Sequence, residues 1–272
     1  MMLKFSRRVS LLALTLSAGA LAQTGCVEES APVEQVSSVA QALSSQTLLA
    51  VANGALWARG AIGPTTGNDW VYSGDANGVT GMASYNGYLY VASGGSLWRR
   101  GALGPGTGND WTEAGDAFGV QAMAVFNNTL YAVFADRLYS RGAIGPGTGN
   151  TWSYQGDAYG VTAMAAYAGG LYVTSNGGLY RRGQLGPYSG NDWSRQGDAN
   201  GVTAMMTLNN ALYAVSGGGL YKRGAIGPSS GNDWSYQGEA HGITAMSTNV
   251  PNGSSWPCTP GQVFSASTFI CQ

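Results

Sequence analysis

The chain has few of the residues from which metal and catalytic sites are commonly built. It contains one histidine and three cysteines in 272 residues, too few for a metal cluster or a histidine-based catalytic relay. Charged residues make up only 10 % of the chain, and the formal net charge is −1. Neither nucleic acid nor an anionic membrane surface is therefore an expected partner. We expect no metal ion and no other cofactor.

Glycine and aromatic residues are, in contrast, abundant. The chain holds 43 Gly and 9 Pro, while 11 % of its residues are aromatic and 44 % are hydrophobic. A hydrophobic fraction of this size argues against a disordered chain. Many turn residues between short apolar and aromatic runs are typical of an all-β protein.

The first 26 residues are typical of an export signal. A basic start is followed by an uncharged apolar stretch of 14 residues, Val9–Ala22. This is signal-peptide length, and it is too short to span a bilayer comfortably. Cleavage after Ala22 is one interpretation. The other is lipidation of Cys26, because Thr24-Gly25-Cys26 resembles a bacterial lipobox.

Cysteine parity favours the lipid. Cys258 and Cys271 can form a disulfide with each other, which leaves Cys26 as the odd cysteine. Residues 27–45 are small and polar and are expected to form a tether. Residues 250–272 are expected to form a disulfide-closed tail. We therefore predict an exported protein, either a lipoprotein of the outer membrane or cell surface or a secreted protein, that touches a membrane only through an N-terminal lipid.

Between residues 46 and 249 the sequence repeats five times with a period of 41 residues. Three sets of equivalent positions follow this spacing without slippage: tryptophan from Trp70 to Trp234, methionine from Met82 to Met246, and arginine from Arg59 to Arg223. We call each set of positions 41 residues apart a register. A period of about 40 to 50 residues with strand-like content is typical of β-propeller blades.

Each repeat holds four strand candidates separated by turn residues. In the third complete unit they are Val161–Tyr167, Leu171–Ser175, Leu179–Arg182 and Thr151–Gln155. The repeats open on a strand of the second type, at residues 48–51, and end on one of the first type, Ile243–Asn249. We predict an all-β, five-bladed β-propeller with four strands per blade, closed by pairing of the C-terminal strand with the N-terminal blade.

Charges also follow the repeat, since seventeen of the 21 charged side chains between residues 46 and 249 lie in repeated registers. The arginine register and a register of acids have five members each, so we expect them to pair across blade boundaries. The alternative is that they hydrogen-bond a ligand. These predicted structural pins are Arg59, Arg100, Arg141, Arg182 and Arg223, with Asp75, Asp116, Asp157, Asp198 and Glu239 as the acid register.

The order of the motifs resembles the tachylectin-type lectins. Residues 46–249 contain L-Y-A-V, L-Y-K, G-P, Asn/Asp-Trp and a glycine-rich connector in that order. The resemblance implies a five-bladed propeller that binds N-acetylated amino sugars at sites between blades. Two motifs differ. This chain has Asn68-Asp69-Trp70 where the family pattern is Asp-Asn-Trp, and Asn77-Gly78-Val79 where the family has Gly-Gly-Trp.

Two parts of the repeat supply candidate carbohydrate-binding residues. The Gly-Asn-Asp-Trp loop places amide and carboxylate groups beside an aromatic ring, which suits a sugar, although the same residues also form ordinary turns. The residue before the connector glycine varies in type, so this variable register is expected to be exposed. The loop candidates are Asn68, Asp69, Asn109, Asp110, Asn150, Asn191, Asp192, Asn232 and Asp233, and Thr151 replaces the aspartate in one copy. The variable register is Asn77, Phe118, Tyr159, Asn200 and His241.

These observations favour a multivalent carbohydrate-binding protein at a bacterial surface, with up to five glycan sites. We expect a monomer without catalytic activity, because a nearly symmetric ring lacks the unique asymmetric constellation that an active site usually needs. The alternative is a non-catalytic protein-binding scaffold or adhesin that uses the propeller face.

Overall fold

The computed structural model describes residues 47–59, 62–67, 69–101, 103 and 110–249, together with the backbone of 264–265 and 270–271. The predicted export signal with Cys26, the tether and the side chains of Cys258 and Cys271 lie outside the described residues. In the tail, β21 (Phe264–Ser265) pairs antiparallel with β22 (Ile270–Cys271).

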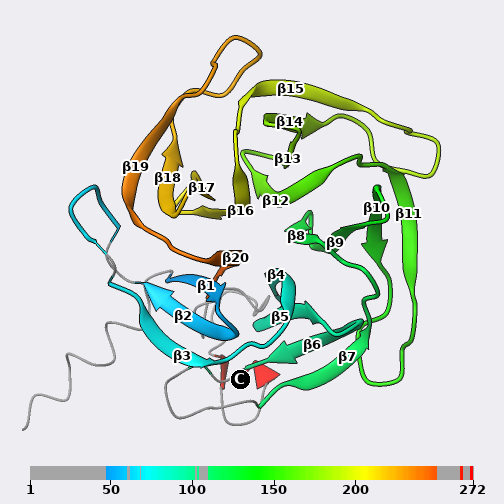
Figure 1. Cartoon of the computed structure of the whole chain (residues 1–272). Helices are drawn as coiled ribbons and strands as arrows, with labels where there is room; N and C mark the ends of the chain where they lie inside the picture. Colours follow the sequence, from blue (N-terminus) through cyan, green and yellow to red (C-terminus); the bar gives the residue numbers. More distant parts are fainter. Residues whose placement is uncertain are drawn as a thin grey trace, which may run out of the picture. The chain divides into compact units, whose positions relative to one another are not determined.

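Five antiparallel sheets of four strands each are arranged in a ring (Figure 1). From the axis outward, blade 1 consists of β20 (Ile243–Thr248), β1 (Leu48–Ala52), β2 (Ala55–Arg59) and β3 (Val71–Asp75). Blade 2 consists of β4 (Val79–Tyr85), β5 (Tyr88–Ser93), β6 (Ser96–Arg100) and β7 (Thr112–Asp116). Blade 3 consists of β8 (Ala122–Phe126), β9 (Thr129–Phe134), β10 (Arg137–Arg141) and β11 (Trp152–Asp157).

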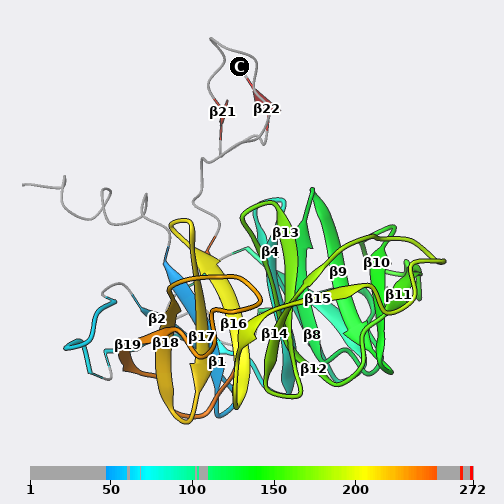
Figure 2. The same ribbon diagram turned by 90° about the horizontal axis from the view of Figure 1, so that it is seen from above.

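The last two blades follow the same order. Blade 4 consists of β12 (Val161–Tyr167), β13 (Gly170–Ser175), β14 (Gly178–Arg182) and β15 (Trp193–Asp198). Blade 5 consists of β16 (Val202–Leu208), β17 (Ala211–Ser216), β18 (Gly219–Arg223) and β19 (Trp234–Glu239). Figure 2 shows the blades edge-on.

The ring closes as the sequence predicts. β1 pairs with β2 on one side and with β20 on the other, with Leu48 opposite Thr248 and Ala50 opposite Met246. β20 also lies beside β4, the inner strand of blade 2. The N-terminal and C-terminal ends of the repeat region therefore share one blade, which leaves no open end in the ring. The predicted all-β fold, blade number and mode of closure are confirmed.

One strand assignment is wrong. The segment predicted as the fourth strand of the third complete unit, residues 151–155, forms β11 and pairs with β10 in the preceding blade. The fourth strand beside β14 is instead β15. The reason is the connector after each outer strand, which carries the chain to the inner strand of the next blade, so that an outer strand belongs to the blade before it.

Apolar side chains between neighbouring blades form the core. The third strand of each blade carries one leucine that is 0 % exposed: Leu56, Leu97, Leu138, Leu179 and Leu220. The methionine register is also buried, in clusters that join inner strands of neighbouring blades. Because of these contacts, the apolar side chains of each blade are buried against the neighbouring blades.

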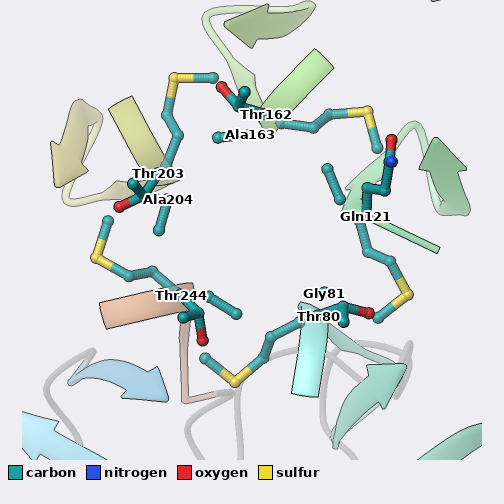
Figure 3. Close-up of a pocket in the computed structure, with 15 residues that line it drawn as sticks. Thr80, Gly81, Gln121, Thr162, Ala163, Thr203, Ala204 and Thr244 are labelled. Atoms are coloured by element: carbon teal, nitrogen blue, oxygen red, sulfur yellow. The ribbon is translucent and has the colours of Figure 1, made fainter. Parts of the chain in front are cut away.

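The axis of the ring is narrow. Four threonines and Gln121 line it together with Gly81, alanines and the methionine register (Figure 3), around a cavity of about 20 Å³, roughly enough for one water molecule. Thr162 Oγ1 donates a hydrogen bond to the carbonyl of Val202 in the next blade, at 2.9 Å, and Thr203 does the same to Ile243 at 3.1 Å. Because these threonine hydroxyls bond the next blade, the lining of the axis helps to hold neighbouring blades together.

Candidate functional site

An arginine and a tryptophan of each blade hold the main chain of the preceding blade. Arg182 Nη1 and Trp193 Nε1 in blade 4 both donate hydrogen bonds to the carbonyl oxygen of Asp157 in blade 3, at 3.2 and 2.7 Å. The guanidinium carbon lies 4.9 Å from the centre of the Trp193 ring, within cation–π range. We call each such pair of an arginine and a tryptophan, bonded to one carbonyl oxygen of the preceding blade, a clamp. The equivalent clamps are Arg59 and Trp70 on Glu239, Arg100 and Trp111 on Asp75, Arg141 and Trp152 on Asp116, and Arg223 and Trp234 on Asp198.

Each clamp arginine is buried, and burial lowers its pKa by desolvation of the charged form. A buried cation is tolerated when its N–H groups are all engaged. Arg182 makes five hydrogen bonds, including Nε to the carbonyl of Gln184 at 2.6 Å and Nη2 to that of Gly190 at 3.0 Å. The arginine register therefore joins the outer loop of its own blade to the preceding blade.

The arginines meet the acid register through main-chain carbonyl oxygens, and not through the carboxylates that the sequence indicated. Four of the five carboxylates have a partner near them in the sequence, on their own outer strand or the connector after it. Tyr72 Oη donates to Asp75 Oδ1 at 2.6 Å, and this hydrogen bond raises the pKa of Tyr72. Equivalent contacts join Tyr154 to Asp157 at 2.6 Å and Arg195 to Asp198, and His241 Nε2 lies 3.8 Å from Glu239 Oε2. All five acid side chains are half-buried at the ends of outer strands.

The loop aspartates close the loop between the third and fourth strands. Asp192 Oδ2 accepts a hydrogen bond from the main-chain N–H of Gln184 at 2.6 Å, and Asp233 accepts one from Ala225 at 2.5 Å. In blade 3, Thr151 Oγ1 donates to the carbonyl of Ala143 at 2.9 Å. In blades 1 and 2 the carboxylate lies 2.8 Å from the clamp arginine, in the pairs Asp69 with Arg59 and Asp110 with Arg100.

The three loop asparagines that the structure describes are, in contrast, exposed. Asn150, Asn191 and Asn232 make no side-chain hydrogen bond within the described part of the chain, whereas Asn68 and Asn109 lie outside the described residues. The glycine before each asparagine contacts the acid register of the preceding blade: the carbonyl of Gly190 accepts from the main-chain N–H of Asp157 at 2.7 Å. Each described asparagine therefore follows a residue that is fixed against a neighbouring acid.

The variable register lies in the connector between the outer strand of one blade and the inner strand of the next, and its side chains approach the hairpin between the second and third strands. All five side chains are exposed, as their variation predicts, and Phe118 and Tyr159 expose 69 % and 54 % of their surface. A β-carbon at Gly177 would lie 2.5 Å from Asn200 Oδ1, and one at Gly218 would lie 2.6 Å from His241 Nδ1. Glycine at these two turns, both with positive φ, therefore allows the variable side chain to cover the hairpin.

Each blade boundary thus combines groups from two blades. One blade supplies the half-buried carboxylate and the exposed variable side chain. The next blade supplies its clamp tryptophan and, in blades 3 to 5, where the loop asparagine is described, that exposed asparagine. The carboxylate offers acceptors, the amide offers both donor and acceptor, and two variable positions add an aromatic ring. Such a set can hydrogen-bond a polyhydroxylated ligand.

A further register escaped the sequence analysis. The residue after the buried leucine of each third strand is aromatic in all five blades and half-buried: Trp57, Trp98, Tyr139, Tyr180 and Tyr221. The repeat motif G-L-Y-x-R contains this aromatic register, and its occurrence every 41 residues was the pattern that could have revealed it. Strand alternation places the aromatic ring on the opposite side of the sheet from the leucine.

The described ranges contain no group of three or more His, Cys, Asp or Glu side chains that could hold a metal ion. Within the same ranges, no helix is both long and apolar enough to cross a membrane.

Neither a family model nor a curated protein matches this sequence. The chain is similar to solved structures at low identity. One, from work on the de novo evolutionary emergence of a symmetrical protein shaped by folding constraints, is 14 % identical with a TM-score of 0.57, and the match covers 74 % of this chain and 97 % of the other. Another, from a nidogen–laminin complex, is 9 % identical with a TM-score of 0.50 and coverages of 76 % and 99 %. These similarities support the fold alone.

Proposed function

We propose that the protein is a multivalent carbohydrate-binding protein that acts without catalysis. The observation that carries this proposal is the repetition of one polar group at the blade boundaries: a half-buried carboxylate, an exposed variable side chain and, where described, an asparagine without a partner. The buried clamps hold the main chain that carries these groups, so the groups are oriented before a ligand binds. Several weak sites on one rigid ring suit a glycan array, because each engaged site raises the effective concentration for the next.

The proposed ligand class is N-acetylated amino sugars, which rests on the resemblance to tachylectin-type lectins. The proposed location is outside the cytoplasm, at a bacterial surface or in the secreted fraction, which rests on the N-terminal sequence. A carboxylate at each boundary and an amide at the boundaries where the loop asparagine is described are consistent with this class, since they can bond the hydroxyl and acetamido groups of the sugar.

Isothermal titration of the full chain with the β-1,4-linked trimer of N-acetylglucosamine tests the proposal. The variant Asn191→Ala removes an exposed amide without a partner, so we expect the stoichiometry to fall by about one site while the melting temperature stays unchanged. Tyr188→Ala is the matched control, because Tyr188 is 99 % exposed at the tip of the same loop. Absence of binding to the trimer and to a broad glycan array would exclude carbohydrate binding.

A protein-binding scaffold is the second candidate. Phe118 and Tyr159 are large exposed aromatic side chains at equivalent positions of adjacent blades, and aromatic residues are enriched in protein interfaces. Surface plasmon resonance against candidate proteins with the double variant Phe118→Ser/Tyr159→Ser distinguishes the two. If the double variant no longer binds a protein partner but still binds glycans, the result favours a scaffold function for these two residues.

A further inference from the structure

The aromatic register is half-buried: Trp57, Trp98 and Tyr180 pack against the core and still leave part of their surface exposed. In each third strand the leucine is fully buried, and the aromatic residue after it leaves part of its ring exposed. The next residue varies freely, from Ala58 to Arg99 and Ser140. The cross-strand partner on the outer strand is tyrosine in blades 1, 3 and 5, Glu113 in blade 2 and Arg195 in blade 4. An aromatic ring is retained in all five blades between positions that tolerate change.

The rings are held in place at the end of the blade that carries the acid register. Trp57 Nε1 donates to the carbonyl of Ala52 at 3.2 Å, and Trp98 Nε1 donates to that of Ser93 at 3.1 Å. The Tyr180 ring folds over the hairpin, because a β-carbon at Gly178 would lie 2.7 Å from Tyr180 Cε2. These contacts orient the rings of Trp57, Trp98 and Tyr180. In blade 3, in contrast, the Phe134 ring stacks on the Tyr139 ring with the two centres 3.9 Å apart, so one face of Tyr139 is covered.

The other groups of the candidate site lie beside this hairpin, on the outer strand and on the connector that follows it. In blade 1 the Trp57 ring centre lies 5.8 Å from that of Tyr72, and Tyr72 in turn bonds the Asp75 carboxylate at 2.6 Å. Asn77 Oδ1 lies against the adjacent hairpin residue Gly54. An aromatic face, a carboxylate and an amide therefore border one turn of one blade.

We propose that the aromatic register is the stacking platform of the glycan sites in blades 1, 2, 4 and 5, on which the apolar C–H face of a pyranose ring packs while the nearby polar groups bond its hydroxyl groups. This inference rests on the proposed function and adds four binding residues to it, because in blade 3 the Tyr139 ring stacks on Phe134. A ring held by neighbouring contacts loses little entropy on binding. Because the indole face is larger than the phenol face, the sites of blades 1 and 2, with Trp57 and Trp98, bind the sugar more tightly than those with tyrosine.

Tryptophan fluorescence provides a direct test. The full chain is titrated with the β-1,4-linked trimer of N-acetylglucosamine, and acrylamide quenching is measured with and without the trimer. We expect the trimer to shift the emission and to protect part of it from quenching. The double variant Trp57→Phe/Trp98→Phe should lose the part of this response that comes from Trp57 and Trp98, although trimer still binds. Tyr188→Ala, far along an exposed loop, should retain it.

Single-site titration gives the second arm. Tyr180→Ala should weaken one site by about three- to tenfold, whereas Tyr180→Phe, which keeps the ring, should restore the affinity. Thermal melting of both variants separates loss of binding from loss of folding, and Tyr180→Phe remains informative if the alanine variant unfolds.

The outcomes separate the inference from the function on which it rests. Binding of trimer by wild type with an unchanged fluorescence response in Trp57→Phe/Trp98→Phe, or with full affinity in folded Tyr180→Ala, overturns the stacking platform. Failure of wild type to bind any glycan overturns the proposed function instead, before the aromatic variants are considered.

Discussion

The clamp of Arg182 and Trp193 makes a quantitative prediction, because both side chains donate to one carbonyl oxygen. Arg182→Ala removes five hydrogen bonds from a buried cation and empties the space beside the Trp193 ring. We expect this change to lower the free energy of unfolding by about 3 to 4 kcal/mol. Trp193→Phe removes the indole N–H and keeps an aromatic face, so it should cost about 1 to 2 kcal/mol.

The double variant separates a shared acceptor from two independent contacts. In each single variant the Asp157 carbonyl keeps one side-chain donor, at 2.7 Å from Trp193 or 3.2 Å from Arg182. In the double variant it keeps neither, so the loss should exceed the sum of the single losses by about 1 kcal/mol.

Urea unfolding followed by circular dichroism measures these free energies, with Tyr188→Ala as a surface control. Strict additivity of the two changes, or a loss below about 1 kcal/mol for Arg182→Ala, would refute the idea that the clamp joins blades 3 and 4 through this carbonyl.

Four further predictions follow from the same contacts and from the sequence. Asp192→Ala should lower the free energy of unfolding by about 1 kcal/mol, because the loop hydrogen bond is lost. If this loop supports more than one glycan site, calorimetric titration should show that the affinity of all sites falls together. Deletion of residues 243–272 removes β20 and exposes β1, so cooperative melting should give way to aggregation, which light scattering detects; a soluble, cooperative product contradicts closure by β20. Burial raises the pKa of Tyr131 and Tyr213, so their contribution to stability should be complete below about pH 10 and lost as the pH rises through their folded-state pKa; unfolding measured from pH 8 to 12 would contradict this if stability stayed constant. Cys26→Ser should move the protein from the membrane to the soluble fraction if a lipid anchors it, and unchanged fractionation would favour cleavage after Ala22.

The repeat by itself determined the architecture. A strict period of 41 residues, four turn-separated runs per unit and an incomplete unit at each end leave a closed ring of five blades as the arrangement that leaves no edge open. The buried positions were equally readable, since Leu179 and Met164 recur with apolar neighbours at every repeat. The sequence placed one strand in the wrong blade because periodicity reports spacing and not which blade an outer strand joins.

Only the tertiary structure decided what the charged and aromatic registers do. The arginine register and the acid register had equal numbers, which suggested pairs of side chains, but the acceptor proved to be the main-chain carbonyl, as for Asp157 with Arg182. Because every residue has a main-chain carbonyl, the residue type does not predict which carbonyl is the acceptor. The position of Trp57 could not be predicted from the sequence either, because a tryptophan in a strand is equally typical of the core. Its half-exposed ring lies beside Tyr72 and Asp75 because of the twist of the blade and the turn that ends the strand.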